Sequence, residues 1–490
     1  MSFTEIMLPL LPETVLVCTA LAMLGIAALK RASTTKEGVN AWMAAMGVLL
    51  AGLAAWFMPD SAPSTPLLVS DSLASTVRGA VLGCGLIAVL LPAAAGEIRH
   101  RAEYRALMLF ALTGLLLAVR TNHLLMMFVA LELASLTQYL LTGFSRSARA
   151  SEAALKYFLF GAVSASFLLF GLSLVYGAGH TLDFIALQSV SQSPMLIVGL
   201  AMALVGLGFK LAAVPFHAWA PDVYQGASAP VVALVAGASK IAGAAILVRF
   251  LAVGFPGHAG SASWGGMHAG WSPWLAVLAV ASMVAGNILA LAQNSVRRLL
   301  AYSAIANTGY FFVPLASGSE EAISGALFYV TVYAVATLGA LAVTSGVERA
   351  NGQDSREAFA GLIKRSPMLA VALLICLASL AGVPPLAGFI GKFTMFSQTL
   401  KSGMSHGNAG LAWLVAIAVA MSALSLYYYL LVLKQAFASS AEAQHAATLP
   451  LGHRLAILLP SAVLLLIGLF PSLLLSPISS AVRALLDGPS

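Results

Sequence analysis

Charged residues are scarce in this 490-residue chain. They make up 9% of the sequence, whereas hydrophobic residues make up 60%; soluble domains have about 25% charged residues. Long uncharged runs exclude an ordinary soluble fold, and the lack of strict alternation within them excludes a β-barrel. The chain is therefore predicted to be an all-α polytopic membrane protein.

Cysteine motifs and nucleotide-binding motifs are also lacking. The three cysteines lie far apart in apolar runs without C-x-x-C spacing, so neither a disulfide framework nor a metal cluster is indicated. No glycine-rich phosphate loop or nucleophile constellation supports soluble enzyme chemistry. The net charge of +7 comes from basic residues scattered over short loops, so nucleic-acid binding is not expected. We expect no cofactor, redox centre or metal in this chain.

Hydropathy indicates about fourteen transmembrane helices of about 20 residues each. The first is expected to be a retained span, because no basic region precedes it and no small-residue cleavage site follows it. The predicted spans are residues 7–29, 40–58, 74–96, 105–120, 123–143, 153–177, 195–216, 228–251, 274–292, 299–316, 321–346, 368–400, 411–434 and 455–475.

Basic residues are distributed unevenly between the two sets of loops. Cytoplasmic loops are enriched in Lys and Arg, so the richer side is expected to be cytoplasmic and both termini to be outside. Sixteen basic residues fall on that side, and the other side has only Arg78, Arg120, Lys401 and Arg483.

Two predicted spans combine prolines with a nearby lysine inside the apolar stretch. Span seven has Lys210 followed by Pro215 in GLGFKLAAVPFHAWAPD, and span twelve has Pro384 and Pro385 in LAGVPPLAGFIGKF. A proline inside a helix removes a backbone donor and clashes with the preceding turn, so both helices are expected to break inside the bilayer. Transporters place ion sites at such breaks, where the freed backbone groups face protein or water.

The two predicted breaks lie five spans apart. An odd separation turns the second break upside down relative to the first, which predicts two five-helix repeats of inverted topology. The expected organisation is a three-helix N-terminal segment (1–100), a first repeat of spans 4–8 (101–252), a second repeat of spans 9–13 (253–436) and a C-terminal helix (437–490).

Four ionisable residues lie at predicted membrane depth: Glu132 in span five, Lys210 in span seven, Lys240 in span eight and Lys392 in span twelve. An ionised group at a helix centre costs about 2.5–3.5 kcal/mol on insertion scales, so four unpaired charges would cost roughly 10 kcal/mol. They must be paired, hydrated or partly neutral. Such groups can be loaded with protons and emptied, and we predict that they form a lateral proton relay along the membrane midplane.

The flanking polar residues leave two interpretations open. Lys156 lies one turn inside span six and is either an interfacial anchor or an auxiliary relay group. His217 and Asp222 follow the break in span seven and serve either proton uptake or loop capping. Arg249, near the outer end of span eight, is expected to be a snorkelling anchor. The buried charges could also be plain ion pairs in a structural scaffold.

The two proline-containing stretches, together with SKIAGAAILVRF and RRLLAYSAIANTGY, resemble the antiporter-like proton-translocating subunits of respiratory complex I over about residues 100–435. Within that family the chain is most similar to the subunit N branch. The resemblance implies a translocase subunit in the bacterial inner membrane, driven by NADH oxidation and quinone reduction in other subunits. It implies as partners the other complex I subunits, especially antiporter-like subunit M and small membrane subunit K, together with membrane lipid. NADH, FMN, iron–sulfur clusters and quinone would belong to the parent complex.

The same resemblance implies roles for the buried charges. Glu132 corresponds to a glutamate that pairs with the lysine of span seven. Lys240 corresponds to the central connecting lysine, and Lys392 to the terminal lysine. A multi-subunit cation/proton antiporter or a membrane-bound hydrogenase of the same fold is the alternative, and sodium-dependent transport would favour it.

Three further positions match the family's polar positions. Lys156 and His217 occupy sites that the family also keeps polar. Asn307 stands where the family commonly has histidine. An amide binds water but does not titrate near pH 7, so water must carry more of the relay at this point.

Overall fold

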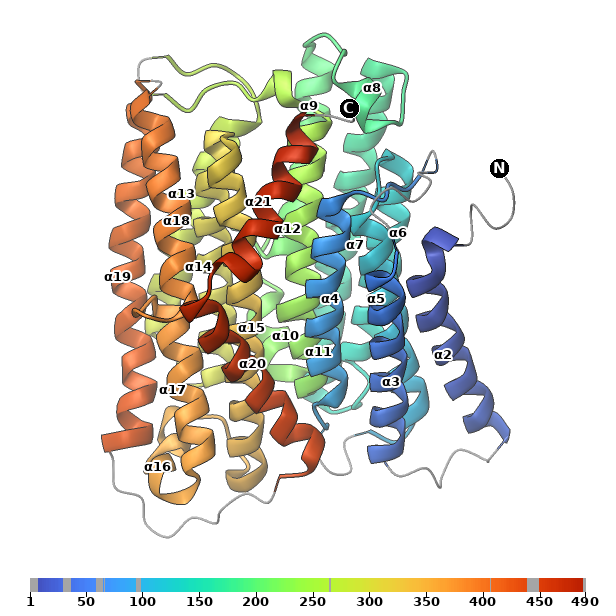
Figure 1. The fold of residues 1–490 in the computed structure, drawn as a ribbon, viewed down its shortest axis with the longest axis vertical. Helices are drawn as coiled ribbons and strands as arrows, with labels where there is room; N and C mark the ends of the chain where they lie inside the picture. The colour runs from blue at the N-terminus through green and yellow to red at the C-terminus, as the bar shows by residue number, and fades with distance from the viewer. Residues whose placement is uncertain are drawn as a thin grey trace.

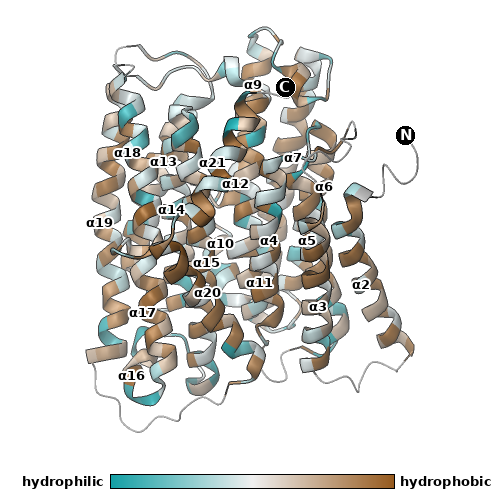
Figure 2. Ribbon diagram, in the orientation of Figure 1, coloured by the Kyte–Doolittle hydropathy of each residue, from teal (hydrophilic) through white to brown (hydrophobic). Residues whose placement is uncertain are grey.

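The computed structural model describes residues 8–29, 37–58, 65, 67–93, 98–263, 266–405, 407–438 and 449–487. Within these ranges the chain is helical, and its β-structure is limited to isolated bridges. Figure 1 shows the helices as an upright bundle with the connections at its upper and lower ends. Hydrophobic residues dominate the helices over most of their length (Figure 2). Lys30, Arg31 and Lys36, which the sequence assigns to basic loops, lie outside the described residues.

Thirteen helices of the described chain are long and apolar enough to cross a membrane. The broken pair α17–α18 adds one more crossing, so the prediction of about fourteen spans in an all-α protein is confirmed. The crossing helices are α2 (Leu11–Leu29), α3 (Glu37–Trp56), α4 (Ser72–Leu90), α5 (Arg101–Val119), α6 (Leu124–Thr142), α7 (Ala148–Gly179), α9 (Pro194–Leu211), α11 to η3 (Ala229–Val253), α13 (Trp271–Leu291), α14 (Val296–Ser317), α15 (Glu320–Asn351), α17 (Pro367–Ala381) with α18 (Ala387–Ser405), α19 (Ala409–Ala438) and α20 (Leu451–Leu469).

Both predicted breaks are present. The helix α9 ends at Leu211 and is capped by Ala212, which has a left-handed backbone (φ 58°); α17 ends at Ala381 and is capped by Gly382, also left-handed (φ 84°). The chain then passes Pro215 to reach the short helix α10 (Ala220–Gly226), or passes Pro384 and Pro385 to reach α18. In the first repeat α9 starts at the upper end beside α8 (Phe184–Leu187), whereas in the second α17 starts at the lower end beside α16 (Leu362–Arg365) (Figure 1). The two repeats are therefore inverted.

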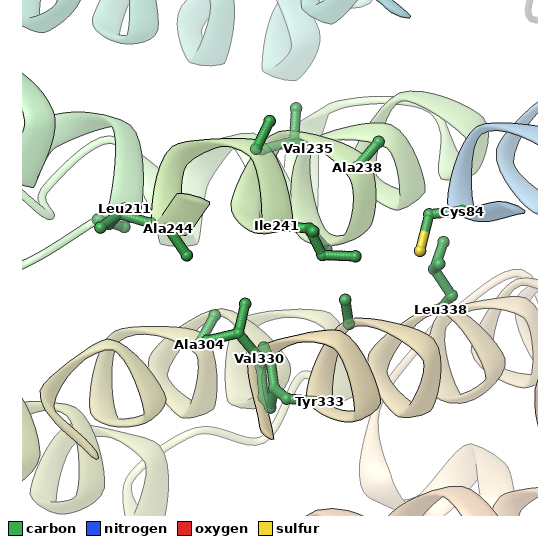
Figure 3. Packing of buried hydrophobic residues seen from close by; sticks show 14 of the residues in the cluster. Cys84, Leu211, Val235, Ala238, Ile241, Ala244, Ala304, Val330, Tyr333 and Leu338 are labelled. Carbon is green, nitrogen blue, oxygen red and sulfur yellow. The ribbon is translucent and has the colours of Figure 1, made fainter. Parts of the chain in front are cut away.

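The span formed by residues 229–253 is not a uniform α-helix. It consists of α11 (Ala229–Leu234), the π-helical stretch η2 (Val235–Ser239), α12 (Lys240–Val248) and a second π-helical stretch, η3 (Arg249–Val253). The apolar windows of this span and of α15 are wholly buried within the chain, whereas only 33% of the apolar window of α7 is buried. Figure 3 shows residues of this span, such as Ile241 and Ala244, facing Ala304 and Tyr333 across the central core. The two buried spans form the axis of the molecule.

The C-terminal region differs from the prediction of one crossing at residues 455–475. The helix α20 ends at Leu469, before Pro471, and a further helix, α21 (Ser472–Asp487), follows. Figure 1 shows α20 running obliquely from the lower end to about mid-height and α21 continuing to the upper end. Pro471 thus separates α20, which is long enough to cross a membrane by itself, from α21.

Arg249 is not a snorkelling anchor. Its guanidinium forms two hydrogen bonds of 2.7 and 2.8 Å with the carboxylate of Asp71, and its side chain is only 3% exposed. Asp71 also accepts from the N–H of Ala74 and so caps α4. Burial raises the pKa of Asp71, but the charge and hydrogen bonds of Arg249 outweigh burial, and the net shift is downward. The pair joins α4 to the end of the central span.

Two arginines assigned by the sequence to outer loops are also buried. Arg120 and Arg78 are 1% and 3% exposed. Their guanidinium nitrogens lie 3.6 and 3.7 Å from the two carboxylate oxygens of Glu13 in the first turn of α2. Arg120 also donates to the carbonyl oxygen of Pro9 and the hydroxyl of Ser70. This charge cluster ties the first helix to α4 and α5.

Removing one partner of the Arg249–Asp71 pair leaves a buried charge without its counter-ion. We expect Arg249→Met to destabilise the protein by about 3 kcal/mol, at the lower end of the usual range because Asp71 is partly exposed. The thermal unfolding midpoint of the purified protein in detergent measures the effect. The double variant Arg249→Met/Asp71→Asn should recover part of the loss; a single variant as stable as wild type would contradict the assignment.

Candidate functional site

Lys210 lies in the last turn of α9, directly before the first break. It is 8% exposed, and its ammonium donates hydrogen bonds to the hydroxyl of Ser135 (3.1 Å) and the amide oxygen of Gln138 (3.3 Å), both on α6. The helix C-terminus favours a cation at this position. Gln138 in turn accepts from the hydroxyl of Tyr157 (3.1 Å). Lys210 is therefore held by neutral oxygen acceptors and a helix dipole.

Glu132 lies on the same helix, one turn before Ser135, and is half-buried. It is close enough to interact electrostatically with Lys210, but the described residues contain no Glu132–Lys210 ion pair within 4.0 Å. Its neighbours along the outer side of α6, Val129 and Leu136, are 51% and 50% exposed. The direct contact implied by the resemblance is thus absent from this arrangement, because Lys210 turns to inward-facing groups while Glu132 lies toward the outer face.

Lys240 follows the π-helical stretch η2 and is 6% exposed. Its ammonium donates to the carbonyl oxygen of Ala304 on α14 and lies 5.0 Å from the ring centre of Tyr333 on α15. Single π-helical turns are frequent at functional sites. A carbonyl and an aromatic face both attract a cation without carrying a full negative charge. Lys240 is thus solvated by dipoles at the molecular axis.

A threonine connects the first break with Lys240. The hydroxyl of Thr308 lies 2.6 Å from the carbonyl oxygen of Leu211, in the last turn before the break, and 3.1 Å from that of Ala304. Ala304 is also the acceptor for Lys240. The α9 terminus carrying Lys210 and the Lys240 ammonium are therefore linked by one side chain.

Asn307 takes part in a network of hydroxyl groups on the other side of Lys240. Its amide nitrogen donates to the carbonyl (2.8 Å) and hydroxyl (3.3 Å) oxygens of Ser303, and its amide oxygen accepts from Tyr329. The hydroxyls of Ser303 and Tyr429 lie 2.5 Å apart. Both ends of the Asn307 amide are therefore hydrogen-bonded.

The network continues toward the second break. The rings of Tyr429 and Tyr428 pack 4.6 Å apart, and the Tyr428 hydroxyl donates to the amide oxygen of Asn287 (3.1 Å). The amide nitrogen of Asn287 donates to the hydroxyl of Tyr310 (3.0 Å), whose ring lies 5.4 Å from the ammonium of Lys392. These residues, which the sequence analysis did not single out, fill the space between Lys240 and Lys392.

Lys392, on α18, reaches the end of α17 on the other side of the second break. Its ammonium donates to the carbonyls of Leu380 (3.0 Å) and Ala381 (3.3 Å), the last residues of α17, and to the hydroxyl of Ser422 on α19 (2.9 Å). A lysine at this place satisfies carbonyls that the broken helix leaves without partners. Lys392 also lines a cavity of about 500 Å³ between α18 and α19, beside the exposed ring of Phe393.

Lys156 and Asp222 lie away from this row. Lys156 pairs with Glu152 (2.7 Å) and Asp222 (2.8 Å), and Asp222 also pairs with Arg298 on α14 (2.8 Å). Burial raises the pKa of Asp222, but its hydrogen bonds to Lys156 and Arg298 outweigh burial and the net shift is downward. These ion pairs tether α10 to α7 and α14.

His217 lies half-buried in the turn after the first break. Burial lowers the pKa of its imidazole, and its Nδ1 atom has no hydrogen-bond partner among the described residues. The indole nitrogen of Trp219 and the amide nitrogen of Gln138 are likewise buried without partners. Polar atoms of this kind are suited to binding internal water. No group of three His, Cys, Asp or Glu side chains in the described ranges could hold a metal ion.

Comparison with known proteins gives consistent results. A family profile described as "NADH:quinone oxidoreductase/Mrp antiporter, TM" matches residues 121–445. NADH-quinone oxidoreductase subunit N 2 of Acidobacterium capsulatum is 45% identical over 380 residues, 77% of this chain and 76% of its own. NADH-quinone oxidoreductase subunit N of Methylobacterium nodulans is 36% identical over 492 residues, 97% of each chain.

Solved structures with the same fold include a chain of respiratory complex I from Thermus thermophilus. It has a TM-score of 0.80 and 33% identity, covering 98% of this chain and 100% of its own. A chain of the Mrp complex from Dietzia sp. has a TM-score of 0.84 at 21% identity, covering 99% and 98% of the two chains. Because the identity to the Mrp complex chain is only 21%, this similarity concerns the fold alone.

The lowered pKa of Asp222 predicts how the stability of the protein depends on pH in the acid range. A carboxyl group with a lowered pKa in the folded protein stabilises the fold above its unfolded pKa, and this contribution disappears as the pH falls through the folded pKa. We expect Asp222→Asn to lower the unfolding midpoint at pH 7 and by the same amount at pH 5. Below about pH 4, the usual range of the group, the difference from wild type should shrink. An equal difference at pH 3 would contradict the ion-pair tether.

Proposed function

Because the chain belongs to the NADH:quinone oxidoreductase/Mrp antiporter transmembrane family, we propose that its buried charges form the proton relay of a complex I membrane-arm subunit. The chain is a proton-translocating subunit of NADH:quinone oxidoreductase, the complex after which its subunit N relatives are named. NADH oxidation and quinone reduction take place in other subunits, which hold the FMN, the iron–sulfur clusters and the quinone. The observation that supports the relay most is the row of hydrogen-bonding groups between the two breaks.

The proposed row begins at Glu132 and ends at Lys392. Lys210 accepts a proton near Glu132, and Lys240 takes it up at the axis. The Asn287 and Asn307 amides do not titrate, so between Lys240 and Lys392 the amides and tyrosine hydroxyls orient water and pass hydrogen bonds rather than store protons. At one end of the row Glu132 is half-buried on α6, and at the other Lys392 lines the cavity between α18 and α19.

The proton supply to Lys240 is proposed to come along α15. A cavity of about 540 Å³ at the lower end is lined by Arg149, Arg297, Ser345 and Glu348. From Glu348, polar side chains follow one face of α15 through Ser345 and Thr337 to Tyr333 beside Lys240, about 22 Å at 1.5 Å per residue. The hydroxyls of Thr337 and Tyr333 are buried without hydrogen-bond partners in the described chain, and an unsatisfied buried hydroxyl is stabilised by water.

The placement of the chain in the cell is part of the proposal. The lower end, with the loop arginines, faces the cytoplasm of a bacterium, and both termini face the periplasm. Subunits M and K of complex I are its neighbours in the inner membrane. The chain is organised as an N-terminal segment (1–100), two repeats (101–252 and 253–436) and a C-terminal part (437–490).

Assignment to complex I is tested by purifying the tagged chain in mild detergent. We expect it to bring with it NADH-dependent quinone reduction, bound flavin and iron–sulfur absorbance. If the chain purifies with hydrogenase or antiporter partners and without NADH oxidation, the fold and the relay would stand, but their energy source would not be NADH oxidation.

Replacing Lys210 tests the relay itself. Lys210→Met keeps the length of the side chain but removes the proton-carrying group, so proton transfer at this step should slow by about 100-fold or more. Proton uptake by inside-out vesicles per NADH oxidised measures the effect. Lys401→Met, an exposed lysine at the upper end of α18, is the matched control. Unchanged pumping in an assembled Lys210→Met complex would defeat the relay assignment.

The supply path along α15 has its own test. Thr337→Val replaces a buried hydroxyl with a methyl group and keeps nearly the same side-chain shape. The protein should therefore assemble normally while proton pumping falls. Thr399→Val is the control, because Thr399 is equally buried and donates only to a carbonyl of its own helix (2.7 Å). Equal pumping in the two variants would exclude Thr337 from the path.

A further inference from the structure

A basic cavity lies at the lower edge of the bundle, away from the relay. It has a volume of about 600 Å³ and is formed where the connection from α4 to α5 meets the turn between α6 and α7. Its polar lining comes from Arg99 and His100 in the first segment and from Ser145 and Arg146 in the second; Leu140 and Phe144 supply apolar surface. The cavity thus joins charged groups from two loops to the end of a membrane helix.

The arginines around this cavity differ from most others in the chain. Arg99 and Arg146 line it, and Arg101 and Arg149 lie within three residues of them in the sequence. None of the four forms a side-chain hydrogen bond or ion pair with the described residues, whereas arginines elsewhere in the bundle are held by carboxylates or carbonyls. The carboxylate of Glu103 lies 3.4 Å from the imidazole of His100. The positive charge is therefore left largely uncompensated by the described chain.

The backbone at the cavity is unusual. Arg146 has a left-handed conformation (φ 56°), which an L-residue with a long side chain rarely adopts. Its N–H donates to the carbonyl of Gly143 (3.1 Å), and the next residue, Ser147, caps the start of α7 through the N–H of Ala150. The turn is therefore fixed at both ends. An arginine at a position suited to glycine or asparagine points to a role for its side chain.

An apolar surface leads from the cavity into the membrane. Leu125, Val129, Leu136 and Leu140 lie along the outer side of α6 and are 52%, 51%, 50% and 61% exposed. They extend over about 22 Å of helix, comparable with the length of a lipid acyl chain. Leu140 lines the cavity itself, so the apolar surface and the basic cavity are continuous.

We propose that this cavity binds the phosphate headgroup of an anionic phospholipid, with the acyl chains lying along α6. Arginine recognises phosphate oxygens by paired hydrogen bonds, and basic pockets at the cytoplasmic end of membrane helices suit anionic headgroups. The continuity of the apolar surface favours a lipid over free phosphate. The headgroup cavity contains none of the proposed relay residues, and its test does not depend on proton pumping.

The test compares Arg99→Gln/Arg146→Gln with Lys364→Gln/Lys434→Gln in the purified, assembled complex. The control variant also removes two positive charges from the lower edge of the bundle, but at positions away from the cavity. After an extensive detergent wash, wild type and control should retain at least one more anionic phospholipid per complex than the arginine variant, as measured by mass spectrometry of the extracted lipid.

Adding lipid back distinguishes the possible occupants. Phosphatidylglycerol should raise the thermal midpoint of wild type and control but not of the arginine variant, and phosphatidylcholine and inorganic phosphate should have no effect. Equal lipid retention in all three proteins would overturn the proposal. If inorganic phosphate raised the thermal midpoint equally, the cavity would be a site for free anions. If the arginine variant lost a neighbouring subunit without a change in bound lipid, the cavity would be a protein contact. Either result would also overturn the proposal.

Discussion

The central part of this structure depends on one constraint. Its buried ammonium groups need a polar environment, although water does not surround them. Lys210, Lys240 and Lys392 are each 8% exposed or less, and none forms an ion pair within the described chain. Their acceptors are carbonyls and hydroxyls. A carbonyl dipole stabilises the charged form less than a carboxylate does, so neither the charged nor the neutral form of these lysines is locked. This is the condition that a relay group requires.

The broken helices supply many of these acceptors. A helix terminus exposes carbonyls that no longer have intrahelical partners, and the bilayer tolerates them only inside protein. At the first break such a carbonyl, that of Leu211, accepts from Thr308; at the second, those of Leu380 and Ala381 accept from Lys392. The breaks are thus sources of polar groups at a depth where the rest of the chain is apolar.

Prediction from sequence succeeded where one residue determines the outcome. Prolines near a lysine in an apolar run identify both breaks, and the odd number of spans between the breaks gives the inverted repeat. It failed where the partner is distant in sequence: Arg249 lies 178 residues from Asp71, and nothing local distinguishes a paired arginine from a snorkelling one. The tyrosines around Asn287 were missed because aromatic residues are common in apolar helices, and only the packing of α13, α14 and α19 brings their hydroxyls together. On α6, however, Ser135 and Gln138 follow Glu132 at helical spacing, which could have identified them as neighbours of the site.

In the proposed relay, the groups between Lys240 and Lys392 form one continuous path for protons. Asn287 is the most direct place to test it, because this residue joins Tyr428 to Tyr310 by its two ends. The measurement is the number of protons translocated per NADH oxidised by vesicles that contain the assembled complex with Asn287→Leu, beside Thr113→Val as a buried control outside the row. The account predicts a lower ratio in the Asn287 variant and a wild-type ratio in the control. A wild-type ratio in both would show that protons reach Lys392 by another route.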